Sequence, residues 1–291
     1  MQQKISNKLK IKINKIASFL NINQFILYGG AAVDLLTSKT PKDYDIAIKY
    51  KNKKEILNLR NHLKNNGFKI VEPWREYIVH KNKKVILVYA KNNKYFLDIA
   101  FLKNFNLIGL YDIESVYISY PEMRIVDKYN GLKNIKNKKI NFIRNISSEN
   151  PYVALGRLIY LSAKYDISLF HPRNTNLLMT LKKKSENYKS KSKYFNKQVI
   201  PSFYSHILKA ILKSNNKLEF IKSLINLKVF DKIFPSLSIA LNYIVNRQLI
   251  NKLFKINDKE GLIKFLGDCL ENRNKKEFLK EINKLKIRKW E

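Results

Sequence analysis

The chain has 291 residues, 45% hydrophobic and 12% aromatic, a composition that excludes an intrinsically disordered protein and suffices for two domains of ordinary size. Its 57 Lys and Arg residues against 23 Asp and Glu give a net charge of +34, which favours a polyanionic partner, with nucleic acid the first expectation. A single cysteine, Cys269, excludes an internal disulfide and indicates a reducing compartment, by default the cytosol. No apolar run could span a bilayer, so no membrane partner is expected.

The first hundred residues read as an alternation of strands and helices. A basic amphipathic segment at 1–16 is expected to be a helix of the fold rather than a targeting sequence. Short apolar runs predict strands at 25–28, 44–50, 68–72, 76–80, 83–90 and 95–102, and helical spacing predicts helices at 31–36 and 53–64. The closely spaced later strands predict an antiparallel meander. Trp74 and Arg75 are placed in a turn, and Asn82 and Asn92–Asn93 supply further turn residues.

The stretch 25–50 combines two features that suggest chemistry. The first strand runs into Gly29-Gly30, whose lack of Cβ atoms lets the backbone approach a phosphate group at the start of a helix. The next strand carries Asp43 and Asp45, which project from the same face because side chains alternate with a period of two. Two like charges this close favour a divalent cation, and Mg²⁺ prefers such oxygen ligands.

A third carboxylate, Asp98, lies between Leu97 and Ile99 in the apolar strand 95–102. A lone carboxylate buried there would cost several kcal/mol unless it were paired or bound to a metal. Three strand-borne carboxylates can hold two Mg²⁺ ions about 3.5–4 Å apart, the arrangement that stabilises attacking and leaving oxygens in phosphoryl transfer. Each feature alone has an ordinary structural explanation, and their order along the chain points to metal-dependent nucleotidyl transfer.

From about residue 146 the apolar spacing changes to three and four, which predicts an all-helical second half. The expected helices are 151–165, 174–184, 202–213, 217–229, 236–255, 258–270 and 274–286. The chain is therefore expected to comprise two domains, 1–145 and 146–291. Its fold class is α+β, with a mixed sheet and helices in the first domain and a helical second domain.

Here the sequence resembles the tRNA CCA-adding enzymes and bacterial poly(A) polymerases of the polymerase β-like nucleotidyltransferase superfamily. The similarity is carried by the head signature at 29–46, by IVDKYNGLKNIKNKKI at 125–140 and by the neck-like helix ENPYVALGRLIYLSAKYDISL at 149–169. It covers about residues 20–170. By this resemblance the first domain is the nucleotidyltransferase head and the second a helical neck and body that binds RNA.

The resemblance also implies residue roles. Asp43, Asp45 and Asp98 would be catalytic and ligate the metals, and Gly29 and Gly30 would cradle the triphosphate. Asp112 falls where the family contacts the nucleotide sugar, with Tyr111 in place of the family Arg. The positions of the base-selecting Glu-Asp-x-x-Arg motif carry Glu149, Asn150 and Val153, and the next family Arg falls on Gly156, one position before Arg157. The remaining candidate nucleotide-binding residues are therefore Glu149, Asn150 and Arg157.

These observations predict a template-independent transferase that adds nucleotides from Mg-bound ATP, and possibly CTP, to an RNA 3′ end. The expected substrate is tRNA, to which CCA or part of it is added. The alternatives are a poly(A) polymerase and a basic RNA-binding protein that has kept the fold but lost nucleotide selection. The Lys- and aromatic-rich segment 182–197 is either an RNA-gripping element or a solvated surface loop.

Overall fold

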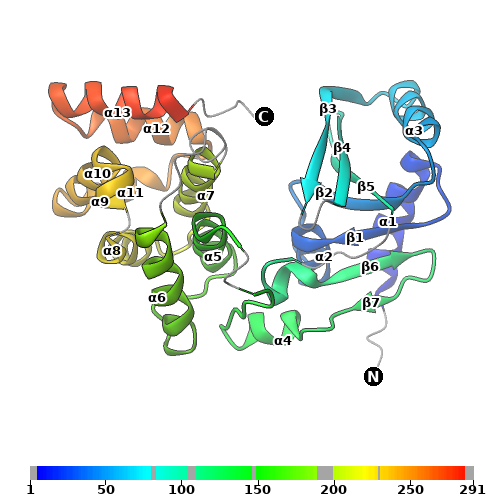
Figure 1. Cartoon of the computed structure of the whole chain (residues 1–291), viewed down its shortest axis with the longest axis horizontal. Coiled ribbons are helices and arrows are strands. Elements are labelled where there is room, and N and C mark those ends of the chain that lie inside the picture. Colours follow the sequence, from blue (N-terminus) through cyan, green and yellow to red (C-terminus); the bar gives the residue numbers. More distant parts are fainter. Residues whose placement is uncertain are drawn as a thin grey trace. The chain divides into compact units, whose positions relative to one another are not determined.

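The computed structural model describes residues 5–79, 83–103, 109–145, 149–188, 199–228 and 230–285. The chain divides into two compact units, Met1–Asn134 and Ile135–Glu291 (Figure 1). The boundary between the units lies after Asn134, whereas the sequence predicts a boundary after residue 145. The first unit contains the β-sheet, and the second is built of helices.

The first unit is organised around a seven-stranded mixed sheet with the strand order β3-β4-β5-β2-β1-β6-β7. Strands β2 and β5 run parallel, and the other neighbouring pairs are antiparallel. The mixed sheet followed by a helical unit confirms the predicted α+β class. The strands are β1 Phe25–Tyr28, β2 Tyr44–Lys49, β3 Lys69–Val79, β4 Lys83–Lys91, β5 Phe96–Leu102, β6 Tyr117–Tyr120 and β7 Ile125–Val126.

Two helices pack on one face of this sheet. Helix α1 (Asn7–Leu20) begins after Ser6, whose hydroxyl accepts a hydrogen bond from the Leu9 amide, and it buries apolar side chains at helical spacing. Helix α3 (Lys53–Asn65) contributes a similar stripe. Both stripes join one core with alternate residues of the strands, among them Tyr44, Ile46 and Ile48 of β2. Residue 45 therefore projects from the opposite face of the sheet.

The strands β3, β4 and β5 form the predicted antiparallel meander. At the β4–β5 turn, the Asn92 side-chain oxygen accepts hydrogen bonds from the amides of Lys94 at 2.9 Å and Tyr95 at 2.8 Å. This local bonding is what favours Asn in turns, so this predicted turn residue is confirmed. Asn82 lies outside the described residues.

The predicted separation of strands 68–72 and 76–80 is wrong, because both belong to the single strand β3. Its pairing with β4 shifts register between Val71 and Arg75. Pro73 lies within this irregularity and has no N–H to donate to a ladder. Since β3 is an edge strand, the proline interrupts the pairing without ending the strand. Trp74 and Arg75 are thus strand residues.

The second unit is helical, as predicted. Helix α4 (Gly131–Lys136) spans the division between the units, and no helix in the described parts of the chain has both the length and the apolarity needed to cross a membrane. The remaining helices are α5 Pro151–Lys164, α6 Pro172–Asn187, α7 Ile200–Lys213, α8 Lys217–Leu227, α9 Phe230–Ile233, α10 Pro235–Asn246, α11 Ile250–Leu253, α12 Lys259–Asp268 and α13 Asn272–Leu285.

The predicted helix 236–255 is interrupted. Helix α10 ends at Asn246, and Gln248 adopts a left-handed backbone conformation with φ of 55°. The Leu249 amide then bonds back to the Ile244 carbonyl at 2.9 Å, which closes the helix end. Such a turn usually contains glycine, so a glutamine there gives no sequence signal that the helix stops.

Candidate active site

Gly29 joins strand β1 to helix α2 (Gly29–Leu36) in a conformation that favours glycine. Its φ is 59°, and its amide donates a hydrogen bond to the Val116 carbonyl at 3.1 Å. A Cβ at Gly29 would lie 3.7 Å from the Asp45 Oδ2 atom. The glycine turn and this carboxylate are therefore immediate neighbours, as the sequence order suggested.

Asp45 and Asp98 lie directly opposite each other on the parallel strands β2 and β5. Both project from the sheet face opposite the α1–α3 core, since their neighbours Ile46 and Ile99 point into that core. The Ala31 amide, in the first turn of α2, donates to Asp45 Oδ2 at 3.4 Å. The positive end of the helix dipole thus stabilises the Asp45 charge.

Asp98 lies in an environment that disfavours its charge. Its Oδ1 atom is buried and has no hydrogen-bond partner. Burial, followed by the neighbouring charges of Asp45 and Asp43, raises the pKa of Asp98 to about 8. Asp43 lies one residue before β2 and is exposed. All three carboxylates are thus close enough to influence one another electrostatically.

The chemistry of this site fits a hard cation. It offers carboxylate oxygens, the ligands that such cations prefer. The buried Asp98 Oδ1 atom has no hydrogen bond to offset the cost of its burial, and a bound cation would offset that cost. As the side chains are placed, no group of three or more acidic, His or Cys residues within the described ranges could hold a metal ion. Asp45 and Asp98 are brought together by strand register, whereas Asp43 lies beyond the strand end.

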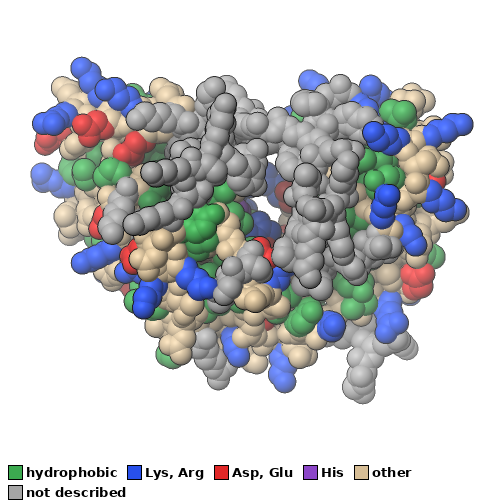
Figure 2. All heavy atoms as spheres, viewed as in Figure 1, with side chains coloured by type: hydrophobic (Ala, Val, Ile, Leu, Met, Phe, Trp, Pro, Cys, Tyr) green, Lys and Arg blue, Asp and Glu red, His purple; other side chains and the backbone are tan. Residues whose placement is uncertain are grey.

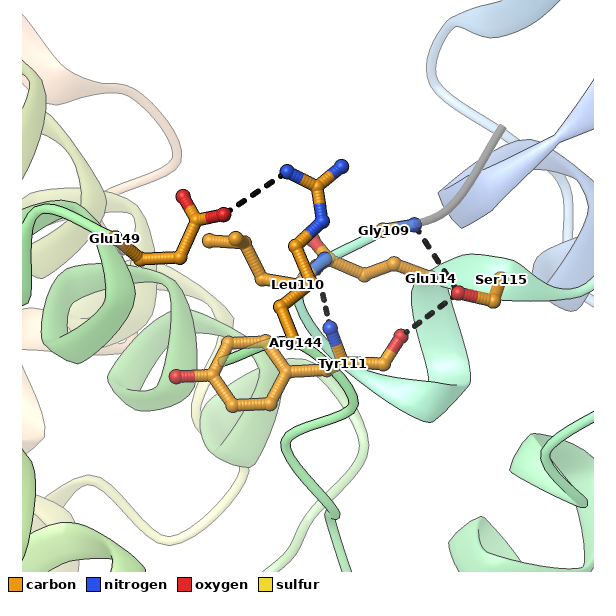
Figure 3. Close-up of polar contacts among 7 residues, drawn as sticks. All are labelled: Gly109, Leu110, Tyr111, Glu114, Ser115, Arg144 and Glu149. Atoms are coloured by element: carbon orange, nitrogen blue, oxygen red, sulfur yellow. Dashed lines mark hydrogen bonds and ion pairs between the residues drawn. The ribbon is translucent and has the colours of Figure 1, made fainter. Parts of the chain in front are cut away.

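A short 3₁₀ turn, η1 (Asp112–Ser115), lies behind the glycine turn and was not anticipated from the sequence. Figure 3 shows how it is tied together. Glu114 accepts hydrogen bonds from the Leu110 and Tyr111 amides at 3.1 and 3.3 Å, and the Ser115 hydroxyl accepts one from the Gly109 amide at 3.1 Å. A Cβ at Gly29 would lie 3.9 Å from the Glu114 carbonyl oxygen, so η1 forms one wall of the turn.

Asp112, the candidate sugar-contacting residue, is fully buried. Its carboxylate accepts hydrogen bonds from the Ile113 amide at 2.8 Å and from the Asn134 side chain at 2.6 Å. A Cβ at Gly131 would lie 2.6 Å from the Asp112 carbonyl oxygen, so the start of α4 packs closely on this residue. The structure places Asp112 in a bonded internal network that fixes η1 to α4.

The other three candidates belong to the second unit. Glu149 forms an ion pair with Arg144 at 3.1 Å, and both side chains are partly exposed (Figure 3). Asn150 caps helix α5, because its side-chain oxygen accepts hydrogen bonds from the first amides of the helix at 3.0 and 3.3 Å. The guanidinium of Arg157 lies over the Tyr160 ring, 5.7 Å from its centroid.

Close helix packing requires a glycine at position 156. A Cβ at this position would lie 2.8 Å from the Phe203 ring and 3.4 Å from the Phe203 Cα atom. Helices α5 and α7 therefore approach each other too closely here for any side chain. The position that matches a family arginine lies inside the helical core, so an arginine could not occupy it in this packing.

We expect Gly156→Ala to destabilise the protein by about 1–3 kcal/mol, because the added methyl group overlaps Phe203. The matched control is Gly267→Ala in helix α12, where the nearest atom to the new Cβ would be 3.6 Å away. That change should be neutral or stabilise by up to about 1 kcal/mol, since alanine favours helix. Thermal unfolding of both variants measures the difference, and equal midpoints would contradict the packing argument.

Comparison with solved structures finds the same fold in CCA-adding enzymes and in a tRNA nucleotidyltransferase. A CCA-adding enzyme in complex with CTP is 16% identical, with a TM-score of 0.62 over 98% of this chain and 67% of that one. The Thermotoga maritima CCA-adding enzyme complexed with tRNA is 17% identical, with a TM-score of 0.62 over 99% and 68%. A tRNA nucleotidyltransferase complexed with a primer tRNA and an ATP analogue is 18% identical, with a TM-score of 0.57 over 96% and 80%.

Comparison by sequence finds no matching family model and no matching curated protein. The structural likeness at this low identity establishes the fold. It confirms the nucleotidyltransferase fold that the resemblance predicted.

Proposed function

We propose that this protein is a template-independent nucleotidyltransferase that extends the 3′ end of an RNA with nucleotides from Mg-bound triphosphates. The preferred substrate is tRNA, to which it would add CCA or part of it. The observation that carries the proposal is the pairing of Asp45 with Asp98, whose buried oxygen lacks a partner, beside the Gly29 turn. The fold shared with enzymes solved in complex with CTP, ATP and tRNA supports it.

The proposed roles follow from the chemistry of each group. Asp43, Asp45 and Asp98 would hold two Mg²⁺ ions, which when bound offset the triphosphate charge and stabilise the attacking and leaving oxygens. The Gly29-Gly30 backbone and the first turn of α2 would bind phosphate oxygens. Asp98 would take up the proton of the RNA 3′-hydroxyl. The 3′-oxygen then bonds to the α-phosphorus as the bond to the β-phosphate oxygen breaks and pyrophosphate leaves.

The RNA partner is supported by charge. The formal net charge is +34, and Lys and Arg side chains are spread over the visible surfaces of both units (Figure 2). Such a surface attracts phosphate backbones without selecting a sequence. Most of the basic segment 182–197 lies outside the described residues, so its part in RNA binding stays a prediction.

A second candidate function, less selective addition such as polyadenylation, is favoured by the state of the base-selecting positions. The Asn150 side-chain oxygen serves as a helix cap, Glu149 is ion-paired and Gly156 is packed against Phe203. Val153 cannot form side-chain hydrogen bonds. If these positions do not read the base, discrimination between CTP and ATP depends on other groups.

The deciding experiment incubates the protein and Mg²⁺ with each labelled triphosphate in turn, using either a tRNA without its CCA end or an oligoadenylate primer. Incorporation into the tRNA alone, lost in Asp45→Ala, supports CCA addition. Incorporation of ATP into both primers supports the polyadenylating alternative. Incorporation into neither primer, with RNA binding retained, would leave only the RNA-binding protein with a degenerate fold.

A further inference from the structure

The first unit carries a second surface feature, an open depression of about 430 Å³ away from the paired aspartates. It is formed where the second half of α1, the end of α3 and the β4–β5 turn converge. Aromatic rings, side-chain amides and lysines line it, including Phe19, Tyr95, Asn66, Asn92, Lys15 and Lys94. The proposed reaction uses none of these residues.

The depression lies on the opposite side of the sheet from Asp45. Tyr95 packs against Tyr44 with ring centroids 5.8 Å apart, and Tyr44 belongs to the core beneath α1 and α3. Because Tyr44 and Asp45 are adjacent in β2, their side chains point to opposite faces. A ligand in the depression therefore cannot be the triphosphate held at the Gly29 turn.

Two aromatic side chains give the depression a surface on which a base can stack. Phe19 and Tyr95 meet edge to face with centroids 5.0 Å apart, and both are half-buried. The buried Phe68 also packs against Phe19, with ring centroids 5.3 Å apart, and anchors the aromatic pair to the core. Lys15, one helical turn before Phe19, lies with its ammonium 5.7 Å from the Tyr95 centroid. The rings thus already attract a cation and present an accessible edge or face.

The rim supplies the polar groups that a nucleotide needs. The exposed Lys15 and Lys94 side chains can neutralise backbone phosphates, and the exposed Asn93 amide can bond to a base edge. The Asn66 amide nitrogen is bonded to His62, which leaves its carbonyl oxygen as an acceptor. No acidic residue is among the described residues that line the depression. Lysines around aromatic rings are the combination that binds single-stranded nucleic acid, whereas a basic peptide would find no acidic partner for its charges.

We propose that this depression binds an unpaired nucleotide of the RNA substrate, one that lies away from the reacting 3′ end. The inference deepens the proposed function by adding a contact for the same partner, and it rests on the RNA partner but not on the chemistry at Asp45. The open shape fits a nucleotide that the rest of its strand also anchors, since a free mononucleotide would gain little enclosure there. Such a contact would help the first unit to hold RNA by itself.

The test compares two charge-reversed variants in binding a fluorescently labelled single-stranded oligoribonucleotide, with EDTA and without triphosphate. Lys15→Glu/Lys94→Glu reverses the charge of the rim and keeps the rings of Phe19, Phe68 and Tyr95 in place. Lys10→Glu/Lys54→Glu changes two exposed lysines, one on the far side of α1 and one at the other end of α3. Both variants lower the net charge equally. We expect the rim variant to weaken binding roughly tenfold more than the control, and equal weakening would overturn the proposal.

A second readout locates the contact directly. An oligonucleotide containing 4-thiouridine, photocrosslinked to the wild-type protein, should attach to peptides that contain Phe19 or Tyr95. Crosslinks confined to other peptides would exclude the site. The outcomes also separate the two proposals: crosslinks here without nucleotide transfer would refute only the proposed reaction, and transfer without such crosslinks would refute only this contact.

Discussion

Replacing Asp45 with asparagine is expected to lower nucleotide incorporation by roughly three powers of ten while leaving RNA affinity nearly unchanged. The substitution keeps the size of the side chain and its bond from the Ala31 amide but removes the charge opposite Asp98. Preorganised charge at the reacting phosphate is usually the largest contribution to catalysis, and one neutral donor alone is worth about 10²–10³ in rate. A metal-binding carboxylate should be worth at least as much.

Asp166→Asn provides the matched control, because Asp166 is an exposed aspartate of the second unit that pairs only loosely with Lys138 at 3.6 Å. Its incorporation rate should equal that of the wild type. Asp43→Asn should resemble Asp45→Asn if Asp43 joins the site in the working enzyme. Single-turnover incorporation and oligonucleotide binding, measured on the same preparations, separate a loss of catalysis from a loss of RNA affinity. Loss of RNA binding in Asp45→Asn would contradict the proposed division between chemistry and RNA contact.

The sequence revealed the acidic residues but not the contact between them. Side-chain alternation is a local property, so Asp45 could be assigned to a strand face, and the apolar neighbours of Asp98 indicated its burial. The parallel pairing of β2 with β5 is non-local. It depends on how the meander folds back beside β2, and no short-range pattern specifies the register that places Asp45 opposite Asp98.

Other features could not be predicted from the sequence, because they depend on tertiary contacts rather than on the periodicity of side chains. The turn η1 is held by Glu114 and by the close approach of residue 109, where a Cβ would lie 2.4 Å from the Glu114 Cβ atom. A single glycine in the sequence does not reveal which side chain crowds it. As a carboxylate, Asp112 could equally belong to a binding site or to the protein interior. Only its hydrogen bonds to Ile113 and Asn134 show that it serves an internal network.

Replacing Asp98 with asparagine is expected to stabilise the protein in EDTA while abolishing transfer. In the unfolded chain the Asp98 carboxyl titrates near its ordinary pKa of about 4, whereas in the folded protein burial and the charges of Asp45 and Asp43 raise that pKa to about 8. Between these values the unfolded state releases the proton and the folded state keeps it. Wild-type stability therefore declines as pH rises from about 4 to about 8, and asparagine removes this cost.

The gain from Asp98→Asn should consequently be small at pH 4 and grow to a few kcal/mol at pH 8, as measured by urea denaturation across this range. Asp166→Asn is the control, since the Asp166 side chain is exposed and belongs to the second unit. Millimolar Mg²⁺ should reduce the stability difference between the wild type and Asp98→Asn. A ligand that binds the folded state raises stability, and Mg²⁺ should bind the folded wild type but not the variant, which lacks the Asp98 carboxylate. If Asp98→Asn raised the free energy of unfolding by the same amount at every pH and with or without Mg²⁺, the charge of Asp98 would not destabilise the folded protein, and the prediction would be wrong.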